Sequence, residues 1–176
     1  YKAALGDYVK VAGRIPLPPR YAFGYWWSRY WPYSDDEIDD IVATLDGLGI
    51  PQDVMIIDMD WHETYGLGRQ SAFDDVGQRV GWTGYTWKDG LFANPRSFLK
   101  RLHDRHLKIA LNLHPASGIQ PMEDCYARFR EAYGWQGTNA IPYRLSEAKW
   151  ADCWYGEVLG RLEQDGVDFW WLDWQQ

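Results

Sequence analysis

One carboxylate closes an apolar, aromatic stretch near the end of the sequence. Residues 169–172 read Phe-Trp-Trp-Leu, which is typical of a strand buried on both faces, and Asp173 follows them. In barrels of parallel strands, the catalytic residues lie at the C-terminal ends of the strands. Asp173 is therefore a candidate catalytic carboxylate, although an acid in this position can also merely cap the next element. Trp170, Trp171 and Trp174 surround it, and indole faces serve both as sugar platforms and as core filler.

Two more polar clusters follow apolar segments. Residues 58–63, which include Asp58 and Trp61, come after the apolar stretch 53–57, and His114 follows the apolar stretch 107–113. Since parallel strands have their C-terminal ends at one edge of the sheet, we expect Asp58, His114 and Asp173 to lie close together there. We call this edge the mouth. The long segment from residue 64 to 91 is predicted to be an excursion of the chain with a functional role. Its residues 84–87, which end in Trp87, are expected to return toward that mouth.

Helix signals separate these strands. Ser34 with Glu37 forms a capping box, and Asn94 followed by Pro95 is a second helix start. A third helix is predicted over residues 121–133, and a fourth from after Ser146 to the glycine at position 166. A first strand is predicted at residues 23–27.

Alternating strands and helices indicate a parallel α/β domain. No glycine-rich phosphate loop follows the first strand, which argues against a nucleotide-binding doubly wound sheet. We predict a (β/α)8 barrel of TIM type, of which only about the first four β/α units are present, because eight units typically need about 250 residues. Residues 1–18, with their prolines, read as a linker or lead-in segment, and residues 19–176 as the first half of the barrel.

Composition limits the classes of partner. The chain is 46% hydrophobic and 24% charged, which excludes a disordered chain. Its net charge of −7, without a Lys/Arg stripe, argues against nucleic acid, and no apolar run suggests a membrane span. Aromatic residues make up 17%, which fits either a carbohydrate ligand or a Trp-rich core. The two cysteines do not indicate a compartment. The first residue is Tyr1 and the last lies just past Asp173, so we expect a piece of a larger protein.

Several motifs in order resemble glycoside hydrolase family 31. Residues 171–176, Trp-Leu-Asp-Trp-Gln-Gln, are similar to the family's nucleophile motif, commonly Trp-Ile-Asp-Met-Asn-Glu. Residues 19–24 resemble its barrel entry, and residues 50–61 its second strand. Trp87 and residues 92–95 are similar to a stretch that reads Thr-Trp and then Phe-Pro-Asp-Pro in relatives.

This resemblance implies a retaining, exo-acting α-glycoside hydrolase that uses no cofactor and no metal. Asp173 would be the nucleophile, Asp58 would bind hydroxyl groups of the sugar, and Trp171 would line the pocket. Trp61, Trp87 and His114 are further candidate substrate-binding residues. The family's acid/base residue lies on a later strand. The implied partners are therefore an oligosaccharide or other α-glycoside, the remaining half of the barrel, and accessory β domains, and the fragment alone is expected to be inactive.

The sequence also departs from the family pattern. Trp174, Gln175 and Gln176 stand where relatives commonly have Met-Asn-Glu, so α-galactosides or N-acetylated sugars are alternatives to α-glucosides. His114 stands where many relatives have an acid, and it could contact substrate or cap a loop.

Three other functions can be compared with the sequence pattern. A metal hydrolase fits poorly, because His103 and His106 lie near the end of a predicted helix, while His62 and Asp60 are possible ligands without partners in the sequence pattern. A non-catalytic carbohydrate-binding module would explain the aromatics and acids equally well. The chain could also be a structural half-domain whose site lies elsewhere.

Overall fold

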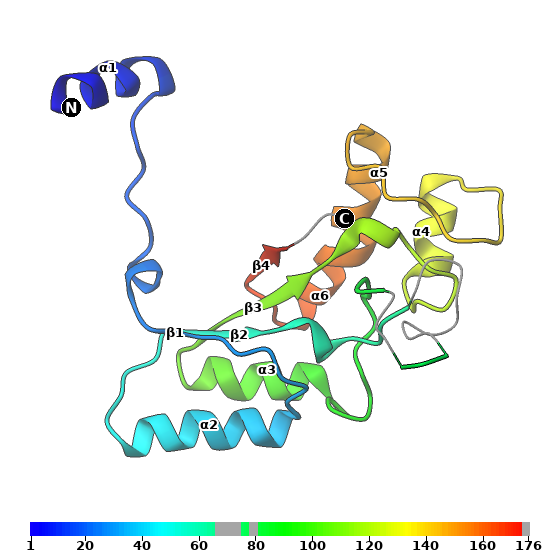
Figure 1. Ribbon diagram of the computed structural model, residues 1–176, viewed down its shortest axis with the longest axis horizontal. Coiled ribbons are helices and arrows are strands. Elements are labelled where there is room, and N and C mark those ends of the chain that lie inside the picture. The colour runs from blue at the N-terminus through cyan, green and yellow to red at the C-terminus, as the bar shows by residue number, and fades with distance from the viewer. Residues whose placement is uncertain (66–74, 78–80, 174–176) are drawn as a thin grey trace.

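The computed structural model describes residues 1–65, 75–77 and 81–173. Within these ranges one parallel sheet contains four strands: β1 (Trp26–Trp27), β2 (Val54–Ile57), β3 (Lys108–Leu113) and β4 (Phe169–Leu172). Their order in the sheet is their order in the sequence (Figure 1). A doubly wound sheet reverses its strand order at a switch point, whereas a barrel does not. The predicted partial (β/α) barrel is therefore confirmed.

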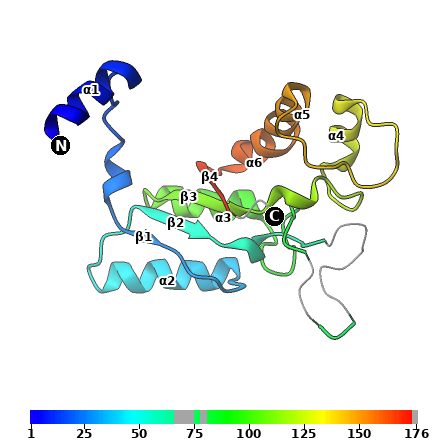
Figure 2. The same cartoon turned by 45° about the horizontal axis from the view of Figure 1, so that its top comes forward.

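Two helices cover one face of the sheet, α2 (Asp35–Gly47) and α3 (Pro95–Asp104) (Figures 1 and 2). Both begin where the sequence predicts. The Ser34 hydroxyl accepts the N–H of Glu37, and the Glu37 carboxylate accepts the N–H of Ser34 at 2.8 Å, which completes the capping box. The Asn94 side chain accepts the N–H of Ser97 at 3.0 Å. These local bonds fix where each helix starts.

The remaining helices partly follow the prediction. The fourth predicted helix is one run of three parts, α5 (Ala148–Cys153), the π-helical stretch η4 (Trp154–Leu159) and α6 (Gly160–Asp165), and it ends at Gly166 with φ of 126°. The third, α4 (Tyr126–Tyr133), begins at Tyr126 and not at residue 121. Residues 121–125 form turns instead, because the Glu123 carboxylate accepts hydrogen bonds from the 85–86 segment.

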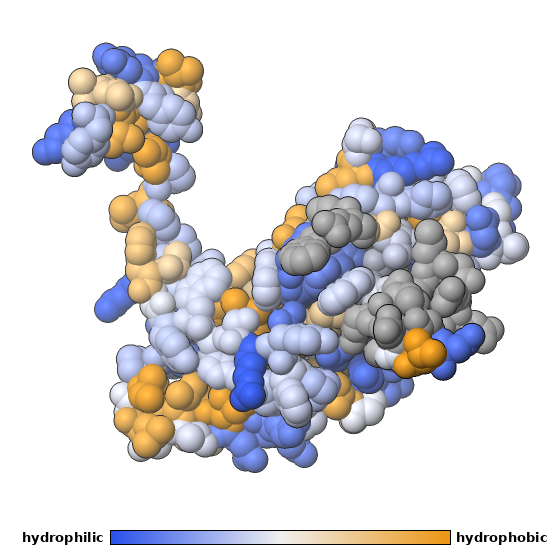
Figure 3. Space-filling model, viewed as in Figure 1, coloured by the Kyte–Doolittle hydropathy of each residue, from blue (hydrophilic) through white to orange (hydrophobic). Residues whose placement is uncertain are grey.

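The N-terminal residues differ most from the prediction. The strand expected at residues 23–27 is reduced to Trp26–Trp27, because the 3-10 helix η1 (Arg20–Phe23) precedes it. The helix α1 (Lys2–Ala12), which the sequence did not predict, buries no residue and stands away from the sheet (Figures 1 and 3). Its signals are weak because Tyr1 at its start makes no capping bond and Gly6 interrupts it.

Side chains alternate between the two faces of each strand. On β2 and β3 the face toward the helices is apolar and almost completely buried, and its residues are Met55, Ile57, Ile109, Leu111 and Leu113. Many of the aromatic residues also belong to this core, since Trp61, Trp150, Trp154 and Phe129 are fully buried. Cys125 and Cys153 are buried and free. None of the helices in the described ranges is long and apolar enough to cross a membrane.

Candidate active site

Asp173 lies at the C-terminal end of β4, beside the end of β3. Its backbone N–H continues the parallel ladder by donating to the carbonyl of Leu113 at 2.9 Å. One carboxylate oxygen, Oδ2, accepts the side-chain N–H of Asn112 at 3.1 Å and lies 3.5 Å from Nε2 of His114. The strand register therefore brings Asp173 and His114 together.

The register also places Trp171 on the same side of the sheet. Asn112 pairs with Trp171 across β3 and β4, and alternate side chains of a strand share a face. One group of side chains thus faces away from the helices, and it consists of Asn112, His114, Trp171 and Asp173. In the part of the barrel that this chain forms, Trp171 lies on the edge strand β4 and is 37% exposed.

Asp58 joins this group from the end of β2. Its carboxylate accepts the N–H of Met59 at 2.7 Å, at the start of the short helix η2 (Met59–Trp61). Burial raises the pKa of Asp58, the hydrogen bond from Met59 opposes that rise, and the negative charge of Asp173 adds to it. The positive charge that His114 can carry lowers the pKa again. Asp58, His114 and Asp173 are therefore electrostatically coupled.

The loop that carries His114 is held by the excursion between β2 and β3. The Thr83 hydroxyl donates to the carbonyl of His114 and accepts the N–H of Ser117 at 3.0 Å. The Trp82 ring lies 5.7 Å from the His114 ring, measured between centroids, and Trp82 is 47% exposed. The sequence predicted that residues 84–87 return to this mouth, whereas Trp82 and Thr83 are the residues that contact His114.

Trp61 and Trp87 lie behind this mouth. Trp61 is fully buried, and its indole N–H donates to the backbone carbonyl of Asn112 at 2.8 Å. The Trp61 and Trp87 rings meet edge to face with centroids 4.8 Å apart, and Trp87 also packs on Phe92. In this structure Trp61 supports the backbone of β3 from the core side and presents no surface to a ligand.

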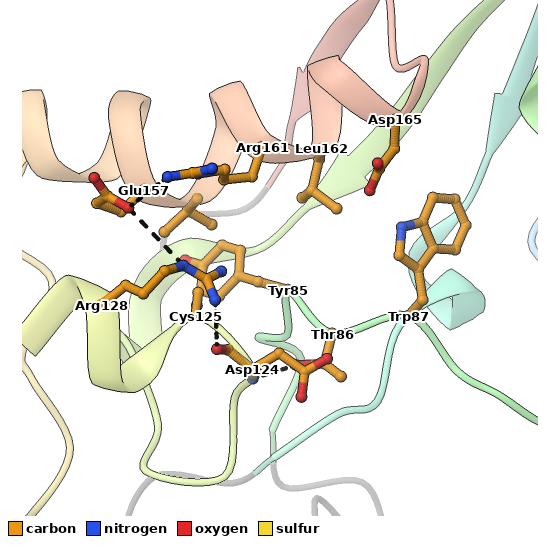
Figure 4. Close-up of a pocket in the computed structure, with 11 residues that line it drawn as sticks. Tyr85, Thr86, Trp87, Asp124, Cys125, Arg128, Glu157, Arg161, Leu162 and Asp165 are labelled. Carbon is orange, nitrogen blue, oxygen red and sulfur yellow. Dashed lines mark hydrogen bonds and ion pairs between the residues drawn. The ribbon is translucent and has the colours of Figure 1, made fainter. Parts of the chain in front are cut away.

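Trp87 lines a separate pocket of about 140 Å³ between α4, the η4–α6 run and the 85–87 segment (Figure 4). Its lining is mixed in charge, and Arg128 and Arg161 both approach the Glu157 carboxylate, at 3.9 and 3.7 Å. None of Asp58, His114, Trp171 and Asp173 lines it. Of the six residues predicted for the site, four therefore share the mouth and two lie elsewhere.

Asn112 is the site residue that sequence reasoning missed. It interrupts the apolar run of β3 at a position two before His114, and residues two apart on a strand share a face. This alternation could have revealed it. Trp82 carried no such signal, since nothing in the sequence around it predicts a bond between Thr83 and His114.

Other predicted features fall outside this group. Trp174, Gln175 and Gln176, where the sequence departs from the family pattern, lie outside the described residues. His103 lies in the last turn of α3, where its Nε2 pairs with Asp168 at 2.8 Å. Among the described residues, no three His, Cys, Asp or Glu side chains are arranged to hold a metal ion.

Two solved structures with a similar fold are enzymes of family GH31. An α-xylosidase of family GH31 from Xanthomonas citri superimposes with a TM-score of 0.67 at 20% identity, over 97% of this chain and 18% of that one. A GH31 dextranase from Flavobacterium johnsoniae, complexed with glucose, gives a TM-score of 0.63 at 20% identity, over 95% of this chain and 20% of that one. At these identities the likeness shows the fold.

Sequence relatives extend the comparison. An α-xylosidase from Saccharolobus solfataricus is 26% identical over 94% of this chain, and an α-glucosidase from the same organism is 26% identical over 96%. The chain covers 20% and 23% of those two proteins. Residues 15–176 match the family model described as the glycosyl hydrolases family 31 TIM-barrel domain. Because that match takes in nearly the whole chain, the chain belongs to glycosyl hydrolase family 31, whose relatives named here are glycosidases.

Proposed function

We propose that the protein containing this chain is a retaining, exo-acting α-glycoside hydrolase with Asp173 as its nucleophile. The observation that carries the proposal is the convergence of Asp58, His114 and Asp173 at the ends of three neighbouring strands. A carboxylate at a strand end, with a second acid and an exposed Trp171 on the same side, suits a sugar that must be held while its anomeric carbon is attacked.

The reaction would proceed in two displacements. A carboxylate oxygen of Asp173 forms a bond to the anomeric carbon as the bond from that carbon to the glycosidic oxygen breaks. The departing oxygen takes a proton from a carboxylic acid that lies beyond residue 176. In the second step, water attacks the anomeric carbon and gives its proton to that same residue, now a carboxylate, and Asp173 leaves as a free carboxylate.

The other residues would bind and orient the sugar. Asp58 would accept hydrogen bonds from sugar hydroxyl groups, and Trp171 would offer an apolar ring to one side of the pocket. His114, with its Nε2 3.5 Å from Asp173, would contact either the substrate or the nucleophile. The names of the relatives, α-xylosidase and α-glucosidase, make α-xylosides and α-glucosides the first substrates to test.

Product stereochemistry tests this proposal. The full-length protein would be incubated with 4-methylumbelliferyl α-D-xyloside, α-D-glucoside, α-D-galactoside and N-acetyl-α-D-galactosaminide, and the first sugar released would be observed by proton NMR. We expect turnover of at least one α-glycoside with release of the α-anomer. Initial release of the β-anomer would contradict a nucleophilic Asp173, and binding of all four sugars without turnover would favour a carbohydrate-binding module.

A further inference from the structure

We propose that Asn112 is a positioning residue for the nucleophile, which holds the Asp173 carboxylate fixed in orientation. This inference rests on the proposed function, since it assigns a task to a residue beside the proposed nucleophile. It starts from the side-chain hydrogen bond from Asn112 Nδ2 to Asp173 Oδ2, at 3.1 Å.

The direction of that bond follows from chemistry. An ionised carboxylate has only acceptor sites, so the amide group must turn its N–H toward Asp173. A donor on one oxygen limits the rotation of a carboxylate group. Asn112 therefore supports one orientation of the group that attacks carbon.

Asn112 is itself firmly held. Its side chain is fully buried, it pairs with Trp171 of β4 as the last but one residue of β3, and its backbone carbonyl accepts the Trp61 indole N–H at 2.8 Å. Because Trp61 is also fully buried, this bond ties β3 to the core directly beneath Asp173. The donor that faces the nucleophile thus comes from a rigid element, which is what precise alignment of a reacting group requires.

Stability alone does not explain a buried asparagine at this position. Its other amide atom, Oδ1, is buried and has no hydrogen-bond partner among the residues that the structure describes. An unsatisfied buried polar group opposes folding. An apolar side chain of similar size would suit the strand better, as Leu111 and Leu113 do on the opposite face. On this proposal, the amide at position 112 is kept for the bond that it donates to Asp173.

The bond engages one oxygen of the carboxylate. Oδ2 accepts from Asn112 and lies 3.5 Å from Nε2 of His114. The amide would hold the carboxylate plane fixed through both displacements.

The test compares two substitutions in the full-length protein, Asn112→Leu and Asn112→Asp, with Lys108→Met as the matched control. Leucine removes the donor at similar size, and aspartate keeps the size while adding a like charge. Lys108 lies on the same strand and the same face, but it pairs with Asp168 at 2.7 Å and not with Asp173. For each protein, kcat and KM are measured on whichever methylumbelliferyl α-glycoside the wild type hydrolyses, together with the melting temperature.

We expect Asn112→Leu to keep or raise the melting temperature while kcat/KM falls about 100-fold, mainly in kcat. Asn112→Asp should also lose activity mainly in kcat, because it places an acceptor where the Asp173 carboxylate needs a donor. Lys108→Met should leave kcat unchanged. If Asn112→Leu misfolds, Asn112→Asp still decides the question through the separate changes in kcat and KM.

A near-wild-type kcat in the soluble variants, or a loss of activity confined to KM, would overturn the assignment. So would a loss of melting temperature that accounts for all the lost activity in both variants. Failure of the proposed function looks different, because the wild-type protein would then form no covalent glycosyl-enzyme on Asp173, whatever occupies position 112.

Discussion

The helix-facing side of the sheet and the side that carries Asp173 are built by the same strands, yet they differ in polarity toward the C-terminal edge. Met55, Ile109 and Leu111 on the first side are apolar and fully buried against α2, α3 and the η4–α6 run. On the other side, Asp58, Asn112, His114 and Asp173 are polar, and Trp171 stays partly exposed.

The difference shows how one fold separates stability from chemistry. Because side chains alternate along a strand, each strand can give one set of residues to the core and the other to a site. The core side gains free energy by excluding water from apolar surface. The site side keeps polar groups whose bonds are incomplete, such as Asn112 Oδ1, which has no partner in the described part of the chain. If this separation is real, substitutions on the two sides should have different consequences.

The largest effect is expected from Asp173→Asn, which keeps the shape of the side chain but removes its charge. The value of kcat/KM of the full-length protein should fall by about 10,000-fold or more, with little change in melting temperature. Asp165→Asn is the matched control, because Asp165 pairs with Arg96 on the surface at 2.9 Å, where ion pairs contribute little. If Asp173→Asn kept more than a tenth of the wild-type activity, Asp173 would not be the nucleophile. The functional distinction between the two faces would then be lost.

Leu111→Ala should lower stability and leave kcat nearly unchanged, which is the opposite of the effect of Asp173→Asn. Leu111 is fully buried on the core side, so the cavity should lower the free energy of unfolding by about 2 to 5 kcal/mol. The kcat per folded molecule should stay within about twofold of wild type, since the side chain points away from Asp173. The measurement combines denaturant unfolding with activity normalised to the number of titrated active sites. A large fall in kcat per site would mean that the faces are not independent.

Glu123→Gln probes the connection between the two sides. Burial raises the pKa of Glu123 from 4.5 to about 7, although its bonds to Thr86 and Tyr85 oppose the rise. Because the folded pKa is the higher one, the stabilising effect of the neutral carboxyl is complete below pH 4.5 and is lost as the pH rises to about 7. The full change is on the order of 3 kcal/mol.

Hydrogen exchange of the 83–87 segment in the full-length protein, corrected for intrinsic rates, measures this effect. In the wild type, protection should fall between pH 5 and 7.5, and in Glu123→Gln it should be independent of pH over that range. Since Thr83 in this segment binds the His114 loop, kcat should follow the same trend. Equal pH dependence in both proteins would show that another group titrates.

The smallest effect is expected from Trp82→Ala. Trp82 is exposed and lies beside His114, so it could stack on a bound sugar. We expect KM to rise roughly three- to tenfold with kcat unchanged, and Trp82→Phe to restore most of the affinity. Tyr155→Ala removes an aromatic ring of similar exposure on η4 and should change neither constant. An unchanged KM in Trp82→Ala would exclude Trp82 from the sugar-binding surface.

The sequence predicted those features that depend on local chemistry. Ser34 and Asn94 cap their helices because a side-chain oxygen within three residues of a helix start finds a free N–H there. The shared mouth of Asp58, His114 and Asp173 was predictable for a similar reason, because parallel strands with right-handed crossovers must end at one edge.

Features that depend on long-range packing were not predictable. Trp61 follows Asp58 closely in the sequence, but the turn of η2 directs its ring inward to the carbonyl of Asn112, which no local pattern indicates. The late start of α4 results from the bonds between Glu123 and residues 85–86, far away in the sequence. Asn112 was detectable from alternation with His114, but its bond to Asp173 required the register of β3 and β4.

Covalent labelling tests the central claim most directly. The full-length protein would be treated with a 5-fluoro glycosyl fluoride of the sugar that it hydrolyses best, digested, and mapped by mass spectrometry. We expect one labelled peptide, which contains β4 and carries the sugar on Asp173. The Asp173→Asn protein should carry no label. Label on another residue, or turnover without any trapped intermediate, would contradict Asp173 as the nucleophile.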